Sequence, residues 1–260
     1  MAFYKYREPS ENHIKALENN ELWFARADTF NDPFDAHPPL NIISYKSMAK
    51  LLRGREKAFL LDDTQFDKIV SKELNIANQL IKEGRLEEHP IYPYFIYMAE
   101  KVARRFIFSL SQSNTNVLMW SHYSQSHTGF CIRYNLNVLL NEIDISHHEA
   151  VNYSNDLPDL LAAMIDDKNV DLSNEIILLK SRDWGYEKEY RLLLDDFSND
   201  KDDKCRSVTH SDAAIERIYF GINTEESLKE NLQDILSSKQ VEFFQMERAK
   251  SSIAVYPFEL

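Results

Sequence analysis

The chain has 260 residues and a formal net charge of −12; 43% of the residues are hydrophobic and 12% are aromatic. This composition supports a large hydrophobic core and excludes extensive disorder, while the negative charge disfavours charge-driven binding to nucleic acid or anionic membranes. Only 5 glycines are present and no Gly-rich phosphate loop occurs, which excludes the common dinucleotide and nucleoside-triphosphate folds.

No apolar segment is long enough to cross a membrane, and the N-terminus lacks the apolar stretch of a signal peptide. The two cysteines, Cys131 and Cys205, make neither a disulfide framework nor a zinc motif. We therefore expect a cytoplasmic protein with no membrane partner.

Strand and helix signals follow one another irregularly along the chain. Alternating apolar residues predict strands at Phe3–Arg7, Glu21–Ala25, Phe106–Ser111, Phe130–Tyr134, Glu149–Tyr153, Tyr186–Leu194, Ile218–Phe220, Val241–Met246 and Ile253–Tyr256. Helical spacing and capping residues predict helices at Glu11–Asn19, Asn135–Asn141, Pro158–Ile165, Ser173–Lys180 and Glu225–Leu236. This order predicts one α+β domain over residues 1–260 with a mixed or antiparallel sheet.

A turn is predicted after the second strand. Asn31-Asp32-Pro33 is a strong turn signal, because proline fixes φ and the side chains of Asn and Asp hydrogen-bond to nearby backbone. We expect the flanking Phe30 and Phe34 to pack this turn against the core.

A helical insert is predicted over residues about 44–105. Apolar residues recur there at helical spacing and indicate roughly three helices. Its basic residues, such as Arg53 and Arg104, form either a solvated helix face or a substrate-facing patch.

The densest polar stretch of the chain is Trp120–Tyr134, WSHYSQSHTGFCIRY. Two aromatics, two histidines, three serines and a glycine precede an apolar strand. Polar groups beside a buried strand are costly to bury unless something satisfies or uses them. One alternative is a turn whose His and Ser side chains bond local backbone; we favour a functional site.

A second candidate is Glu187-x-Glu189. If both residues lie in one strand, their side chains point to the same side, and two close carboxylates raise each other's pKa, which suits acid/base or cation-stabilising chemistry. Arg191 extends this row and would neutralise one carboxylate. The alternative is an exposed edge strand with a ladder of ion pairs.

The sequence gives little support for a metal site or for a Ser/His hydrolase. His122 and His127 are five residues apart and share no helical face, and no H-E-x-x-H motif is present, so no metal is expected. The G-x-S-x-G elbow of Ser/His hydrolases is missing.

The chain resembles a bacterial family catalogued as domain of unknown function 2971 (DUF2971). The resemblance rests on YKYR at Tyr4–Arg7, ELWFA, FNDPFD at Phe30–Asp35, FSLS at Phe108–Ser111, LMWSHYSQSHTGFCIRY at Leu118–Tyr134, VNY at Val151–Tyr153 and LLKSRDWGYEKEYRL at Leu178–Leu192. The family label implies no activity.

The order of motifs is also similar to that of the ADP-ribosyltransferase superfamily. There, an opening strand carries a polar residue, a middle strand carries Ser or aromatic residues, and a late strand carries a catalytic Glu, often in E-x-E. The NDP turn and the WSHY segment depart from that pattern. The resemblance implies an ADP-ribosyltransferase-like fold and the loss of nicotinamide from NAD, used as substrate, through an oxocarbenium-like state.

In this scheme Glu189 stabilises the developing charge on the ribose, Glu187 positions the acceptor, and His122 orients the ribose or shuttles a proton. The residues expected to contact NAD are Tyr6, Arg7, Ser109, Trp120 and Tyr123, with Arg7 on phosphate or ribose and an aromatic ring on nicotinamide. Residues expected to support the site are Asn31, Asp32, His127 and Arg191.

The resemblance favours an NAD-consuming transferase or glycohydrolase, such as a toxin or an anti-phage defence effector, with a protein or nucleic-acid acceptor. Two alternatives stay open. One is a metal-dependent nuclease or hydrolase that uses Asp32, Glu187 and Glu189. The other is a non-catalytic sensor of a nucleotide or a partner protein. In each case we expect the NDP turn, the WSHY segment and the E-x-E strand to converge.

Overall fold

A computed structural model describes residues 1–36, 43–54, 61–156, 159, 172–196, 205–250 and 254–260. The chain divides into two compact units. Unit 1 comprises Met1–Thr29, Arg105–Tyr153 and Ser181–Leu260, and unit 2 comprises Phe30–Arg104 and Ser154–Lys180.

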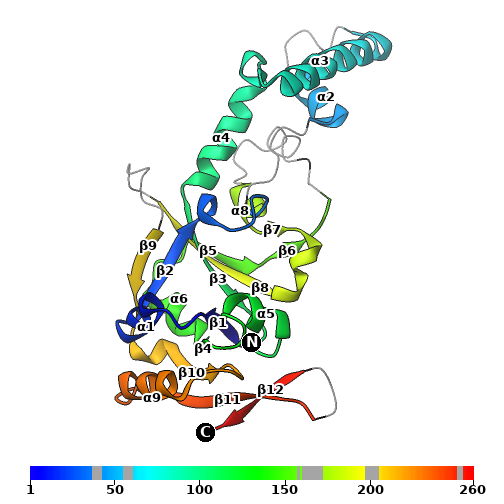
Figure 1. The fold of residues 1–260 in the computed structure, drawn as a ribbon. Coiled ribbons are helices and arrows are strands. Elements are labelled where there is room, and N and C mark those ends of the chain that lie inside the picture. The colour runs from blue at the N-terminus through cyan, green and yellow to red at the C-terminus, as the bar shows by residue number, and fades with distance from the viewer. Residues whose placement is uncertain (37–42, 55–60, 157–158, 160–171, 197–204, 251–253) are drawn as a thin grey trace. The chain divides into compact units, whose positions relative to one another are not determined.

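Unit 1 contains a large, mostly antiparallel sheet (Figure 1). The main path runs in the order β12-β11-β10-β4-β1-β3-β2-β9; β8 pairs with β3, and β5 pairs with β8. Within this sheet, β10 and β11 are parallel. The strands of unit 1 are β1 (Phe3–Arg7), β2 (Glu21–Arg26), β3 (Arg105–Ser111), β4 (Phe130–Tyr134), β5 (His147–Ala150), β6 (Asn152–Tyr153), β8 (Glu189–Asp195), β9 (Cys205–Thr209), β10 (Ile215–Phe220), β11 (Glu242–Arg248) and β12 (Val255–Glu259).

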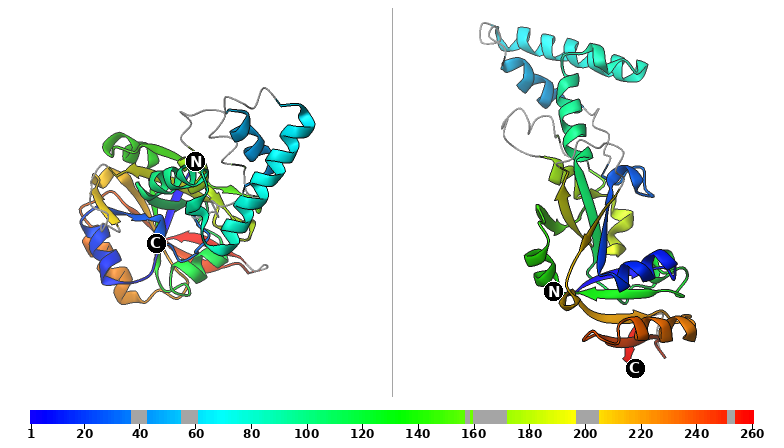
Figure 2. Two further views of the ribbon diagram at one scale, coloured as in Figure 1. Left: turned by 90° about the horizontal axis from the view of Figure 1, so that it is seen from above. Right: turned by 90° about the vertical axis from the view of Figure 1, so that its left-hand side faces the viewer.

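The sheet branches at β3. Two strands share one edge of β3. β2 pairs with its first half, near Phe106 and Ile107, and β1 pairs with its end, where Tyr4 faces Ser111. Beyond that point β1 leaves β3 and continues with β4, and Figure 2 (right) shows β1 and β4 running at a steep angle to β2 and β3. The carbonyls of β3 beside this branch are therefore not paired with β1.

Each face of the sheet carries its own core, as strand alternation requires. One face, called face A here, buries Phe3, Phe108, Phe130, Leu192 and Phe220 and packs on helices α1, α6 and α9. The other, called face B, buries Tyr4, Tyr6, Cys131, Tyr219 and Met246 and packs on helix α5.

The helices of unit 1 are α1 (Glu11–Glu18), α5 (Val117–Tyr123), α6 (Leu136–Glu142) and α9 (Glu226–Ile235), and its 3-10 turns are η1 (Ala27–Thr29), η4 (Arg182–Glu187) and η5 (Asp212–Ala214). Capping side chains fix where two of these helices start. Ser10 caps α1, and the Asn116 side chain accepts hydrogen bonds from the backbone N–H groups of Leu118 and Met119 at the start of α5.

Unit 2 is mainly helical. Its elements are α2 (Tyr45–Arg53), α3 (Asp63–Glu83), η3 (Leu86–Glu88), α4 (Tyr92–Ala103), α8 (Ser173–Ile177) and β7 (Leu179–Lys180). Asp62 and Gln65 form a capping box that starts α3, and Gly84 ends it in the left-handed conformation. The core includes Met48, Phe66 and Val70.

The predicted α+β class with a mixed, mostly antiparallel sheet is confirmed. The three helices predicted between residues 44 and 105 are present as α2, α3 and α4. The helix predicted at Ser173–Lys180 ends at Ile177, and the one predicted at Pro158–Ile165 lies outside the described residues apart from Asp159. No helix within the described ranges has the length and apolar character needed to cross a membrane.

Two local predictions were wrong, and two elements were missed. One missed element is α5, which forms because Asn116 caps it and the apolar side chains of Met119 and Trp120 fall on its buried face. The strand predicted from Tyr186 begins only at Glu189, and β9 was not predicted. Phe34 is 73% exposed, so it does not pack the NDP turn against a core.

A polar cluster at the start of strand β8

Two buried glutamates lie at the point where η4 turns into β8. Lys188, between them, has a φ of 45°, in the left-handed region, and separates the 3-10 turn from the strand. Glu187 therefore ends a 3-10 turn and Glu189 begins a strand, and the two side chains do not follow the simple alternation predicted from E-x-E. Both are buried all the same, with 4% and 6% of their surfaces exposed.

Glu189 forms a two-point ion pair with Arg191. The Nε atom of Arg191 lies 2.8 Å from Oε1 of Glu189, and an Nη atom lies 3.0 Å from Oε2. The Arg191 side chain is completely buried. A fork of this kind holds the carboxylate ionised and fixes its plane, because both oxygens are engaged by one planar group. The expected neutralisation of one carboxylate by Arg191 is confirmed.

Glu187 is held from two other elements. The hydroxyl of Tyr123, on α5, donates a hydrogen bond to Oε1 of Glu187. The hydroxyl of Ser111, on β3, donates to the Glu187 backbone carbonyl over 2.6 Å. Burial and the neighbouring carboxylates, Glu187 first and Glu189 after it, raise the pKa of Tyr123 well above its usual value, so the phenol stays protonated and acts as a donor.

His122 lies at the exposed border of this cluster. Its Nδ1 atom is 3.0 Å from the hydroxyl of Tyr186, the residue that precedes Glu187. Asn116, which caps α5, also donates to the Tyr186 carbonyl over 3.1 Å. Helix α5 and turn η4 are thus tied together at several points, which fixes the glutamates relative to His122 and Tyr123.

A strained loop connects α5 to β4. Gln125, Ser126 and His127 are all in the left-handed region, with φ of 48°, 55° and 68°. Such conformations cost free energy for residues other than glycine and occur often at functional sites. The His127 ring stacks on Trp120, and its backbone N–H donates to the Trp120 carbonyl over 3.1 Å. His127 therefore holds this loop.

Lys5 is a residue that the sequence reasoning missed. Its ammonium donates to the Ser109 carbonyl over 2.6 Å, at the branch where β1 leaves β3, and lies 4.7 Å from the centre of the Phe108 ring. Burial and the positive charge of Arg7 lower the pKa of Lys5 to about 7, although Glu189 and Glu187 oppose the shift. A lysine placed two residues after an inward-pointing phenylalanine in a strand was the available signal.

The residues expected to contact NAD do not all share one surface. Tyr6 and Trp120 are buried on face B, where their rings pack edge to face and their polar atoms bond the backbone carbonyls of Ser113 and Asn114. They serve as core residues there, and the Trp120 ring has no exposed face for stacking. Ser109 lies opposite Arg191 in the β3–β8 ladder.

Arg7 departs from the expected arrangement. Strand alternation places Arg7, like Lys5, with Phe3 on face A, whereas Glu189 lies on face B. Burial is the main cause that lowers the pKa of Arg7, and Tyr134 and Glu8 oppose the shift. Lys5, not Arg7, is the β1 cation whose charge acts on both carboxylates.

The NDP turn belongs to unit 2, whereas the polar cluster belongs to unit 1. Asn31 is exposed, and Asp32 accepts a hydrogen bond from the Phe34 backbone N–H over 2.9 Å, as an Asx turn does. In the same segment Asp35 and Lys180 form a buried ion pair of 3.0 Å. Across the described ranges, no three His, Cys, Asp or Glu side chains are grouped so that they could hold a metal ion.

The comparisons with known proteins bear on the same segment. Residues 119–192 match the family model described as Protein of unknown function (DUF2971). The match spans α5, β4, η4 and the start of β8, and it confirms the resemblance to that family over these residues. No curated protein and no solved structure gave a match.

Proposed function

We propose that the polar cluster binds a nucleotide such as NAD and cleaves its N-glycosidic bond, as the order of motifs resembling ADP-ribosyltransferases implies. The observation that carries the proposal is the pair of buried carboxylates, Glu187 and Glu189, held in one cluster by a protonated phenol and a buried guanidinium. Loss of nicotinamide creates positive charge on the ribose, and a fixed carboxylate in a dry site stabilises that charge strongly.

In this proposal Glu189 faces the developing charge, and Arg191 keeps its carboxylate ionised and oriented. Glu187 and Tyr123 position the acceptor, which is water in a glycohydrolase and a macromolecule in a transferase. His122, at the exposed border, orients the ribose or carries a proton between the site and solvent. Lys5 lies on face A by strand alternation, so it acts on the two carboxylates only through the field of its positive charge from the other side of the sheet.

The test is turnover of NAD labelled in the nicotinamide or the adenosine half, with and without cell extract. Glu189→Gln removes the charge and keeps the shape, so it should abolish nicotinamide release. Glu187→Gln still accepts from Tyr123 and should impair transfer more than release. Glu149→Gln is the matched control: it lies on β5 opposite Arg191, and its side chain is 63% exposed.

Three results would contradict the proposal. One is unchanged nicotinamide release by a folded Glu189→Gln variant. The others would support the alternatives: hydrolysis of nucleic acid that a chelator abolishes would indicate a metal-dependent hydrolase, and ligand-induced stabilisation without turnover would indicate a nucleotide sensor.

A further inference from the structure

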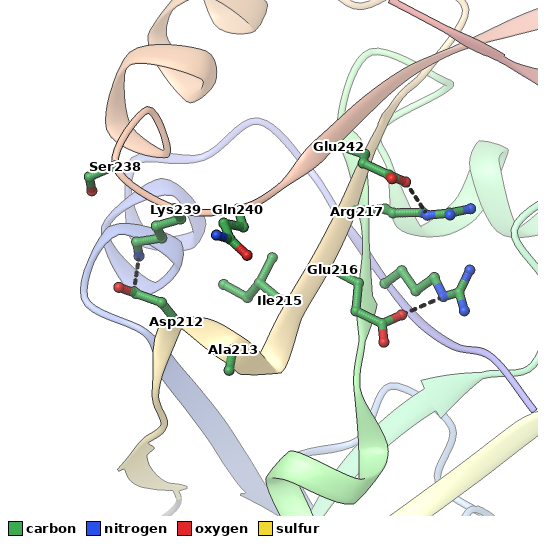
Figure 3. Close-up of a pocket in the computed structure, with 10 residues that line it drawn as sticks. Asp212, Ala213, Ile215, Glu216, Arg217, Ser238, Lys239, Gln240 and Glu242 are labelled. Carbon is green, nitrogen blue, oxygen red and sulfur yellow. Dashed lines mark ion pairs between the residues drawn. The ribbon is translucent and has the colours of Figure 1, made fainter.

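A second polar site lies in unit 1 at the start of β10. It is a pocket of about 600 Å³ whose lining includes Arg133, Asp212, Glu216, Arg217, Lys239 and Glu242. Figure 3 shows the Lys239–Asp212 ion pair on one side, the Arg217–Glu242 ion pair on the other, and Ile215 and Gln240 between them. A pocket of this volume accommodates a small organic ligand.

Two arginines stand side by side at one wall of the pocket. Arg133 on β4 and Arg217 on β10 are directly opposite in the antiparallel ladder. Side chains in such positions lie about 5 Å apart at Cβ, and two like charges there are destabilising.

Each arginine meets a carboxylate through its Nε atom. Nε of Arg133 is 2.8 Å from Glu216, and Nε of Arg217 is 2.7 Å from Glu242. The buried Nε of Arg133 nevertheless forms no aligned hydrogen bond with the part of the chain that the structure describes. A guanidinium has five N–H donors. Arg217 also hydrogen-bonds the Tyr219 hydroxyl, which raises its pKa, and the other donors of the two guanidiniums can serve another acceptor.

Two phenols lie next to this pair on face B. Tyr4 is opposite Arg133 in the β1–β4 ladder, and its ring meets that of Tyr219 edge to face at 5.8 Å. Burial raises the pKa of Tyr4 to about 12, so its hydroxyl stays a donor. The Arg217 guanidinium is 5.2 Å from the centre of the Phe244 ring, which holds its plane.

We propose that Arg133 and Arg217 bind the phosphate group of a small organic phosphate whose remainder fills the adjacent pocket. Paired guanidinium forks match the geometry of phosphate oxygens. Glu216 and Glu242 balance the arginines in the empty pocket; their side chains are 32% and 54% exposed, so they can turn to solvent when a phosphate arrives.

This site is separate from the carboxylate cluster. One transverse row of face B runs from Glu189 through Ser111 and Tyr4 to Arg133 and then Arg217. Neighbouring strands are about 4.8 Å apart, so Arg133 lies about 14 Å along the row from Glu189. Phosphate binding at Arg133 and Arg217 therefore does not depend on NAD cleavage at Glu189.

The experiment is thermal unfolding and calorimetry of the full chain with inorganic phosphate and with adenosine monophosphate, against potassium chloride at equal ionic strength. Binding should raise the unfolding temperature, and the nucleotide should bind at least tenfold more tightly than phosphate if the pocket holds its remainder. Arg133→Gln and Arg217→Gln should each weaken binding at least tenfold. Arg217→Lys keeps the charge and loses the fork, so it should also weaken binding.

Arg85→Gln is the control, because it removes one equally charged arginine that also pairs with glutamates, Glu83 and Glu88. It should bind both probes as the unmodified chain does. Unchanged binding of both probes by folded Arg133→Gln and Arg217→Gln would refute the phosphate site. The site would also be refuted if neither probe, at 10 mM (roughly the weak end of small-ligand affinity), raised the unfolding temperature of the unmodified chain or gave a calorimetric signal. Equal affinity for the two probes would overturn the role of the pocket.

Discussion

Removing the charge of Glu189 should destabilise the protein far more than the loss of one contact suggests. Arg191 is completely buried and Glu189 is 6% exposed, so neither group can recover its hydration when the other is removed. Breaking a buried pair by changing one partner costs about 3–5 kcal/mol, whereas replacing both partners with neutral groups is often close to neutral. For a chain of this size each kcal/mol lowers the unfolding temperature by about 2–4 °C, so Glu189→Gln should lower it by about 6–20 °C.

The assay is urea unfolding followed by circular dichroism for Glu189→Gln, Arg191→Met and the double variant. If the pair acts as a unit, each single variant loses about 3–5 kcal/mol and the double variant loses clearly less than their sum. A double variant that loses the full sum would refute this reasoning.

The chain contains a matched comparison for this pair. Arg85 and Glu88 form the same two-point contact, at 2.7 and 2.8 Å, but their side chains are about half exposed. Glu88→Gln should therefore leave the unfolding midpoint unchanged, because water solvates the remaining charge.

Three further predictions concern unit 1. The pKa of Lys5 is lowered to about 7, so the unfolded chain binds one more proton than the folded chain between about pH 7 and 10.4. The free energy of unfolding of the unmodified protein, compared with that of Lys5→Met, should therefore rise with pH across this window, as measured by chemical unfolding. A Cβ at Gly221 would lie 2.1 Å from a backbone carbonyl oxygen, so Gly221→Ala should cost about 3 kcal/mol or more in urea unfolding, whereas Gly54→Ala, with 3.6 Å of space, should be nearly neutral. Trp120→Phe loses a buried 2.7 Å hydrogen bond and core volume and should cost about 2–3 kcal/mol by the same assay.

Features that depend on neighbouring residues could be predicted from the sequence alone. Alternation placed β1, β3 and β4 to within a residue, Ser10 marked the start of α1, and the Asn-Asp-Pro signal gave the Asx turn at Asp32. These features follow from dihedral preferences and hydrogen bonds that span at most a few positions, so a single sequence carries them. The polar stretch around His122 and the E-x-E motif were recognisable for the same reason.

Which of these residues come into contact depends on how distant strands pair. Lys188 takes up a left-handed conformation because the ends of η4 and β8 are fixed by contacts with α5 and β3, and this removed Glu187 from the strand predicted for it. Pairing of β1 with β4 put Arg7 and Glu189 on opposite faces, and the β4–β10 register set Arg133 against Arg217. The register of β1 is set by strands more than a hundred positions away, and β4 and β10 are about eighty positions apart. Burial of a whole sheet face selects these registers, and no local preference encodes them.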